Sequence, residues 1–326
     1  MQARFTRLAV FVVVCGVAVA GCGKYSIGNI RSAKAFQDGT VLYKKADYKG
    51  AVPLYEDSVR FNPDLGFAYF FLGNSYDNLY KASKKDDPEN VANLTKAAQH
   101  YRTAIDKLAN ATDPKELEVR RNAFEYLIAV YGSDKLNDFA KAEPIAREFI
   151  ESNPGEPATY RVLAKIYEDQ GRFDEAEAQL LKAIDVKPTD AQGYQSLATF
   201  YNDRGDFGKQ MEAWNKRAMV EPKNPEAWHM IGSLYQEKVF RDKTLPRAQA
   251  LEYTLKGLEA EDKALAINAE YYDAVIFKNI LLRKRALYER DPALQKRLIE
   301  EADALSKKGE AIKAKQVGEA AKGIGK

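Results

Sequence analysis

The chain has 326 residues, and its 50 lysines and arginines nearly balance 47 aspartates and glutamates, leaving a formal net charge of +3. This balance argues against nucleic-acid binding, because nucleic-acid-binding proteins concentrate positive charge, and we expect no nucleic-acid partner. Two cysteines and two histidines exclude a disulfide scaffold and a metal site rich in either residue. A hydrophobic fraction of 45% is typical of globular proteins, so the chain is not disordered throughout.

Residues 1–21 have the pattern of a secretory signal peptide. Arg4 and Arg7 precede an uncharged apolar segment, residues 8–20. As a helix this segment would rise about 20 Å, less than the hydrocarbon core of about 30 Å, so it fits a signal better than a membrane span. Without Arg4 and Arg7 the 50 basic residues become 48, against 47 acidic ones. The mature chain would therefore be close to neutral.

The end of this segment predicts a lipid anchor. The motif Val19-Ala20-Gly21-Cys22 resembles the bacterial lipobox, in which an apolar residue and two small ones precede a cysteine that becomes lipidated and N-terminal. The resemblance implies acylation of Cys22 by several chains, which stable anchoring requires. Residues 22–32 would then be the lipidated N-terminus and a short tether.

The residue after the cysteine bears on localisation. In enteric bacteria an Asp at this position favours retention in the inner membrane, whereas this chain has Gly23. We therefore expect an outer-membrane lipoprotein that faces the periplasm, with inner-membrane anchoring as an alternative. An ordinary signal peptide followed by an unmodified cysteine is the other alternative.

A spacing of 34 residues recurs in the middle of the chain. Each of the following sets keeps this interval: Tyr160, Tyr194 and Trp228; Leu163, Leu197 and Ile231; Ala164, Ala198 and Gly232; Tyr167, Tyr201 and Tyr235; Pro154, Pro188 and Pro222. Within one period the apolar residues lie three and four apart, as on one face of a helix. Gly171 ends the first helix, Phe173 opens a second, and Pro188 ends that one. Each helix pair needs a neighbour to bury its apolar face.

The period and the pattern resemble the tetratricopeptide repeat, a pair of antiparallel helices per unit. The resemblance covers residues 33–285 in about seven units, most clearly 157–236. It implies an all-α fold, a right-handed α-α superhelical solenoid without β-strands. We expect insertions near 81–92 and 239–250, and a C-terminal capping helix with a basic tail over 286–326.

In this family the first helix of each unit lines a concave groove that binds a protein or peptide partner. The resemblance places these side chains in the groove: Phe36, Phe70, Arg161, Lys165, Gln195, Thr199, Asn202, His229 and Ser233.

Alternatives remain for several of these residues. Phe36 and Phe70 either form an apolar patch in the groove or pack against a neighbouring helix. Arg161 and Lys165 either hold a carboxylate of the partner or form a solvated pair of cations. The carboxylate clamp of chaperone cofactors is not expected, because it requires an Asn at the position of Lys165. His229 is the histidine with a plausible ligand-contacting role.

The sequence contains none of the common enzyme motifs, and no pair of carboxylates stands out as an acid and a base. We therefore predict no catalytic residues, no cofactor and no metal. The predicted function is an outer-membrane-anchored scaffold for protein–protein interaction in the assembly of an envelope complex such as a pilus or a secretion secretin. One alternative is a carrier for a small ligand or glycan. The other is an enzyme whose pocket is built by the two insertions.

Overall fold

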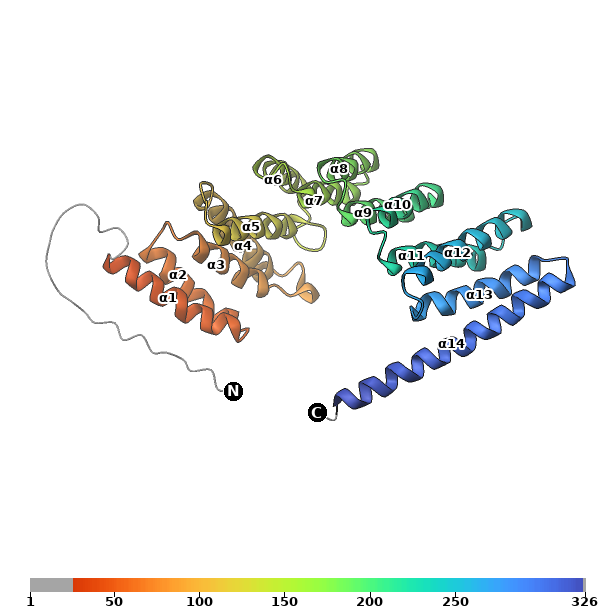
Figure 1. Ribbon diagram of the computed structural model, residues 1–326. Helices are drawn as coiled ribbons and strands as arrows, with labels where there is room; N and C mark the ends of the chain where they lie inside the picture. Colours follow the sequence, from red (N-terminus) through yellow and green to blue (C-terminus); the bar gives the residue numbers. More distant parts are fainter. Residues whose placement is uncertain (1–25, 325–326) are drawn as a thin grey trace. The chain divides into compact units, whose positions relative to one another are not determined.

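The computed structural model describes residues 26–324 of the chain, and it has no β-strand within that range. The described part consists of α-helices joined by short turns, with one 3-10 helix, η1 (Figure 1). The elements are α1 (Ile27–Lys44), α2 (Tyr48–Phe61), α3 (Gly66–Asn78), η1 (Ala82–Lys84), α4 (Pro88–Lys107), α5 (Pro114–Tyr131), α6 (Phe139–Ser152), α7 (Pro157–Asp169), α8 (Phe173–Val186), α9 (Ala191–Asp203), α10 (Phe207–Val220), α11 (Pro225–Arg241), α12 (Arg247–Ile267), α13 (Tyr272–Tyr288) and α14 (Pro292–Ile324). This confirms the predicted all-α class.

The ends of the helices follow from local chemistry. The side chains of Asp87 and Asp113 accept hydrogen bonds from backbone N–H groups at the starts of α4 and α5, and each is followed by a proline in the first turn. After α7 and α9 the chain turns through Gly171 and Gly205, whose φ angles are +73° and +71°. Other residues adopt this left-handed conformation at a cost, so glycine at these two positions ends both helices in the same way.

The chain forms two compact units, one up to Ile145 and one from Ala146 onward. In the first unit α1 packs against α2 and α3 against α4; in the second α7 packs against α8, α9 against α10, α11 against α12 and α13 against α14. Within each unit, consecutive pairs also pack on each other, and the first helices of consecutive pairs touch: α3 with α5, α7 with α9, and α11 with α13. These contacts place the first helices of neighbouring pairs on a common surface within each unit.

The core has a repeated position on the second helix of each pair, which we call the core slot. It lies four residues after an equivalent position of the same helix, which is occupied by Ala51, Ala97, Ala142, Ala176, Gln210 and Gly257. The core-slot side chains are all buried: Tyr55, Tyr101, Ala146, Leu180, Trp214 and Glu261.

In three pairs a glycine of the first helix lies directly against the core slot. A Cβ atom at Gly39 or Gly73 would come within 3.0 Å of the ring of Tyr55 or Tyr101, and one at Gly232 would meet the carboxylate of Glu261. The same backbone approach therefore occurs at the slot that holds Glu261, which supports its structural equivalence to the two tyrosines.

The two predicted insertions have different structures. Residues 81–92 form η1, a short loop and the first turn of α4. Residues 239–250 are mostly helical, because α11 continues to Arg241 and α12 begins at Arg247. At the ends of the array, α1 begins at Ile27, within the predicted tether, and α14 is one continuous helix from Pro292 to Ile324.

Candidate functional site

A polar cavity of about 330 Å³ lies on the first-helix surface of the first unit. It is lined by Tyr43, Asn74, Asp77, Asn78, Tyr126 and Lys135. The Tyr43 hydroxyl donates to Asn74 Oδ1 over 2.5 Å, and Asn78 Nδ2 donates to the same oxygen over 2.7 Å. Burial raises the pKa of Tyr43 to about 12, so its hydroxyl keeps the proton that it donates.

The other wall of this cavity carries an ion pair and an exposed ring. Lys135 Nζ lies 2.5 Å from Asp77 Oδ1, with both side chains largely buried. The Tyr126 ring stacks on Phe70 and Tyr101 at centroid distances of 5.8 and 5.7 Å, yet 42% of the residue remains exposed. The Tyr126 ring is thus held in position by Phe70 and Tyr101, while the rest of its surface is open to solvent.

The predicted apolar residues of this unit lie beneath that surface. Phe36 packs against Tyr55 and Phe71, both at 5.6 Å between ring centroids. Phe70 is only 7% exposed and contacts Phe71 and Tyr101. Both predicted phenylalanines therefore pack against rings of neighbouring helices, as in the second of the two predicted alternatives, and Phe70 also supports the exposed Tyr126.

The predicted cations of the second unit have partners within the chain. Arg161 Nη1 lies 3.2 Å from Asp190 Oδ2, and Lys165 Nζ lies 2.8 Å from Asp169 Oδ1. Lys165 is still 69% exposed, whereas Arg161 is largely buried against α9. Two more predicted residues lie on that helix, where the Thr199 hydroxyl donates to the Gln195 carbonyl over 3.1 Å. Each of the two predicted cations is therefore paired with an aspartate of the same chain.

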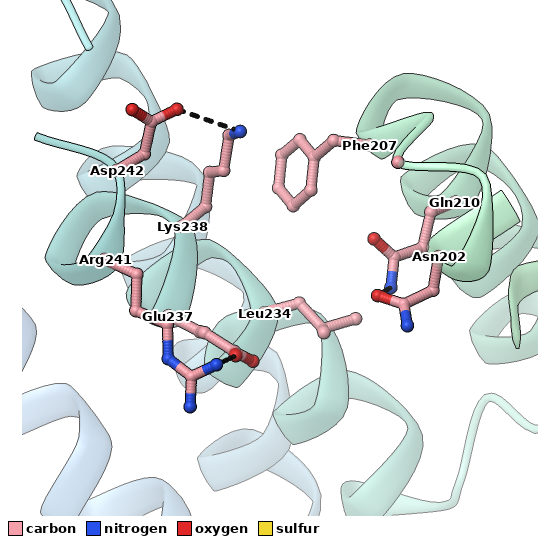
Figure 2. A pocket seen from close by; sticks show the side chains of 9 residues that line it. Asn202, Phe207, Gln210, Leu234, Glu237, Lys238, Arg241 and Asp242 are labelled. Carbon is pink, nitrogen blue, oxygen red and sulfur yellow. Dashed lines mark hydrogen bonds and ion pairs between the residues drawn. The ribbon is translucent and has the colours of Figure 1, made fainter. Parts of the chain in front are cut away.

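A second cavity, of about 370 Å³, lies between the turn from α9 to α10 and the second half of α11 (Figure 2). Phe207 and Leu234 point into it from its two sides. Gln210 Nε2 donates to Asn202 Oδ1 over 3.2 Å on one wall. This cavity brings the predicted Asn202 next to side chains that the sequence did not single out.

The opposite wall of the second cavity is charged and comes partly from the insertion at 239–250. Lys238 pairs with Asp242 at 3.0 Å, and Arg241 pairs with Glu237 at 2.7 Å. Each pair runs along α11 itself, and Arg241 is 82% exposed. An enzyme pocket built by this insertion would need polar groups that converge, and these groups are instead paired with each other.

The last two predicted residues lie together on α11. The hydroxyl of Ser233 donates to the Met230 carbonyl over 2.9 Å. Nδ1 of His229 lies 3.1 Å from both carboxylate oxygens of Glu261 on α12. Glu261 is 0% exposed, and burial raises the pKa of its carboxyl to about 7, although the contact with His229 opposes that shift.

Within residues 26–324, no group of three or more His, Cys, Asp or Glu side chains is arranged to hold a metal ion. No helix in this range combines the length and the apolar character needed to cross a membrane. Cys22 lies outside the described residues, so its predicted lipidation stays a prediction from the sequence.

Comparisons with known proteins agree with the helix-pair architecture. Residues 135–199 match the tetratricopeptide-repeat family. The C-terminal part of a TPR repeat-containing protein from Cytophaga hutchinsonii is similar over 85% of this chain and 95% of its own, with 18% identity and a TM-score of 0.51. The fold is that of the tetratricopeptide repeat. Comparison with curated proteins gave no match.

Two other solved tetratricopeptide-repeat structures are similar at lower scores. PilW, a type IV pilus biogenesis factor, has 18% identity over 74% of this chain and 94% of its own, with a TM-score of 0.41. YrrB, described as having an unusual peptide-binding site, has 16% identity over 61% of this chain and 91% of its own, with a TM-score of 0.39.

Sequence reasoning missed two residues of this tetratricopeptide-repeat surface. One is Tyr126 on α5, which was not among the predicted groove residues. Its signal is an aromatic residue between two core positions, Phe124 and Leu127, which are both buried. Glu261 also had a signal, because it follows Gly257 by the same four residues that separate Ala51 from Tyr55.

Proposed function

We propose that this tetratricopeptide-repeat chain is a scaffold that binds a protein partner on its first-helix surface. The observation that carries the proposal is Tyr126, an exposed ring fixed by stacking on Phe70 and Tyr101 beside a polar cavity. Interfaces draw most of their affinity from a few aromatic anchors of this kind, which lose little conformational freedom on binding. The asparagines and the ion pair around the ring would form the polar rim.

The finer proposal is a lipid anchor in the outer membrane that holds the scaffold on the periplasmic side. It is supported by the charged start, the short apolar segment and the lipobox-like motif ending at Cys22. An anchored scaffold suits the assembly of a multi-protein envelope complex, such as a pilus or a secretion secretin. This process is inferred from the combination of anchor and fold, since fold alone does not select a process.

The two alternatives fit the cavities less well. A carrier for an apolar ligand needs an apolar cavity, whereas the cavity of the first unit is lined by amides, tyrosines and an ion pair. A glycan carrier remains compatible with these side chains, but the ring that it would need is the same Tyr126. An enzyme is disfavoured because the insertion at 239–250 contributes ion pairs that run along one helix.

Site-specific photo-crosslinking in the native cell tests this proposal. We expect a photoreactive amino acid at Tyr126 to give a defined covalent adduct with one protein partner. The matched control is the same amino acid at Leu181, which is 43% exposed but lies on a second helix, α8. Equal labelling at both positions, or no adduct at position 126, would contradict a partner on the first-helix surface.

A further inference from the structure

Glu261 occupies a core position that its counterparts fill with apolar or aromatic side chains. The other core-slot residues are Tyr55, Tyr101, Ala146, Leu180 and Trp214, and all six positions are buried. A fully buried carboxyl group is expensive unless it is paired, and an apolar residue of similar volume commonly stabilises such a site. This repeat therefore departs from the pattern of its neighbours at the one position where stability alone favours a hydrophobic side chain.

The carboxyl group is held against a single partner. Both of its oxygens lie 3.1 Å from His229 Nδ1, and Gly232 leaves the space that it occupies. The imidazole is fixed in turn by Phe277, edge-on at 4.8 Å between centroids, and by Tyr271 at 5.6 Å. The His229 ring thus has one orientation, with Nδ1 toward the core.

The second nitrogen of the ring faces the opposite way. His229 Nε2 has no hydrogen-bond partner among the described residues, and 12% of the side chain is exposed. A cleft of about 480 Å³ includes Phe277, whose ring contacts His229, and Ser233, which lies one helical turn after His229 on α11. The cleft is lined by Ser233, Gln236, Glu237, Phe240, Arg241 and Phe277.

The protonation of the pair decides what Nε2 offers to a ligand. When the pair holds its exchangeable proton, the states are a carboxylate with an imidazolium, or a carboxylic acid bonded to Nδ1 of a neutral imidazole. In both states Nε2 carries hydrogen and donates. When the proton is lost, the carboxylate keeps the Nδ1–H and Nε2 becomes an acceptor. A single titration therefore converts an exposed donor into an exposed acceptor.

We propose that His229 and Glu261 form a proton-dependent docking point, in which Nε2–H donates to a main-chain carbonyl of an extended partner segment whose apolar side chain lies against Phe240 and Phe277. The inference deepens the proposed scaffold function and rests on it. A neutral carbonyl fits better than a carboxylate, because Asp262 and Asp273 act on Glu261 through space and Glu226 lies near Tyr271. Lys278 is shared between two acidic partners, Asp262 at 2.9 Å and Glu301 at 2.8 Å.

Burial sets the direction of the pH dependence. It raises the pKa of Glu261 to about 7, because the low-dielectric core disfavours a pair with a net negative charge, and Asp273 and Asp262 raise it further. The pair therefore keeps its proton below neutral pH, where Nε2 donates. Docking should be strongest under mildly acidic conditions and weaken as the pH rises above neutrality.

Nitrogen NMR on histidine can test the docking point directly, because the chain contains only two histidines. The probe is N-acetyl-leucine methylamide, a minimal peptide unit with two carbonyl groups and one apolar side chain. With the full-length chain labelled with ¹⁵N-histidine, we expect the probe to shift the Nε2 resonance of His229 at pH 6 and to leave that of His100 unchanged. At pH 8.5 the apparent affinity should fall about tenfold, the equivalent of one hydrogen bond.

Two variants separate the pair from its surroundings. Glu261→Leu, which introduces the residue present at position 180, should abolish both the fixed tautomer and the pH dependence of probe binding. The control Glu259→Gln alters an exposed carboxylate on the same helix, which pairs with Lys263, and should behave like the parent chain. Probe binding that is equal at both pH values, or unaffected by Glu261→Leu, would overturn the proposal.

The outcome also distinguishes this inference from the scaffold proposal. If the crosslinked partner still binds Glu261→Leu with unchanged affinity, the docking point is wrong and the scaffold stands. If the probe shifts His229 as expected but Tyr126 gives no adduct, the pair binds a peptide unit, but the partner surface proposed at Tyr126 is wrong.

Discussion

At the scale of single residues, the two histidines of the chain are both largely enclosed but in opposite electrostatic settings. His229 contacts the carboxyl group of Glu261, while His100 stacks on Tyr76 with a centroid distance of 5.7 Å and an interplanar angle of 12°. Burial lowers the pKa of His100 to about 4; Glu56 opposes this shift and Lys96 adds to it. The two units therefore contain groups whose titration affects stability in opposite directions.

The pair in the second unit predicts a stabilising substitution. Glu261→Leu replaces a buried carboxyl by the apolar residue of an equivalent slot, and we expect the free energy of unfolding to rise by about 1–3 kcal/mol. Because folding raises the pKa of Glu261 to about 7, the folded parent binds more protons than the unfolded chain above about pH 4.5. Parental stability should thus fall as pH rises through 7, and the gain should be larger at pH 8 than at pH 5.

Urea unfolding of the parent and Glu261→Leu at both pH values measures this difference. The exposed Glu259→Leu is the control for the added leucine side chain on the same helix. A lower stability for Glu261→Leu at pH 8 would show that the carboxyl contributes more to the fold than an apolar residue would.

His100 predicts the reverse dependence in the first unit. Folding lowers its pKa from 6.5 to about 4, so the unfolded chain binds more protons between these values and stability falls as the pH falls. His100→Gln, which introduces the residue present at position 179 of α8, should reduce the loss between pH 7 and pH 4.5 by about 1–2 kcal/mol. The check is urea unfolding at the two pH values. An equal loss in parent and variant would mean that His100 titrates normally.

The predicted lipid anchor depends on a single residue, Cys22. Cys22→Ser removes the thiol that acylation requires, so we expect the variant to remain uncleaved or to become soluble in the periplasm. Membrane fractionation shows where the variant is found, and its mobility on a denaturing gel shows whether the N-terminal segment has been cleaved. If the variant still fractionates with outer membranes, the lipid is not the feature that localises the protein.

At the scale of helices, sequence periodicity was sufficient to predict the helix pairs, because the spacing of apolar residues within one helix is a local property of the sequence. The i, i+3, i+4 pattern places Leu163, Ala164 and Tyr167 on one face, and all three are buried. The insertion at 239–250 was harder to interpret, since a helix can lengthen at both ends of a turn without changing the spacing of its core residues. In the structure the inserted residues extend the end of α11 and the start of α12.

The candidate site was less predictable than the helices for a physical reason. Repeat spacing identifies the face of a helix, but the freedom of a side chain depends on residues far along the chain. Arg161 is bound by Asp190, and Phe70 is covered by Tyr101 and Tyr126. The ring that stays exposed, Tyr126, was not among the predicted groove residues. These contacts become visible only when the helices are packed.

The long helix α14 has two parts with different roles. Its first half packs on α13 in a cluster that contains Leu298 and Ala302, which are 4% and 0% exposed. Beyond Ile312 the described side chains are exposed, and Lys315 forms a surface ion pair with Glu270 at 2.9 Å. Surface pairs contribute little, usually below about 1 kcal/mol. The end of α14 should therefore be dispensable for folding.

Deletion of residues 314–326 should change the free energy of unfolding by less than about 1 kcal/mol. Leu298→Ala should instead lower it by about 2–4 kcal/mol, because it leaves a cavity in the α13–α14 contact. Thermal and urea unfolding of both proteins provide the comparison. Comparable losses in the two would show that the exposed half of α14 has contacts that matter for stability.

At the scale of the whole molecule, the described chain is a series of helix pairs whose contacts are mainly with adjacent pairs. Within the second unit α8 packs on α9, α10 on α11 and α12 on α13. In such an array stability is approximately a sum over repeats and their interfaces, in contrast to a globular domain with one common core. Binding surfaces can then be distributed, and the polar cavity near Tyr126 and the pair His229–Glu261 belong to different units.

Truncation tests whether this additivity holds. A chain that ends at Pro222 retains α1 to α10 and loses the repeats from α11 onward, so it loses the packing of α10 on α11 and the ring contact of Phe207 with Tyr253 of α12. We expect it to remain helical, with the mean residue ellipticity of the parent and a modestly lower melting temperature, because the remaining pairs keep their neighbours. A truncation at Gly205, which separates α9 from its partner α10, is the control and should destabilise the preceding pairs more. Loss of helicity in the chain ending at Pro222 would mean that the repeats fold as one cooperative body and that the array is not modular.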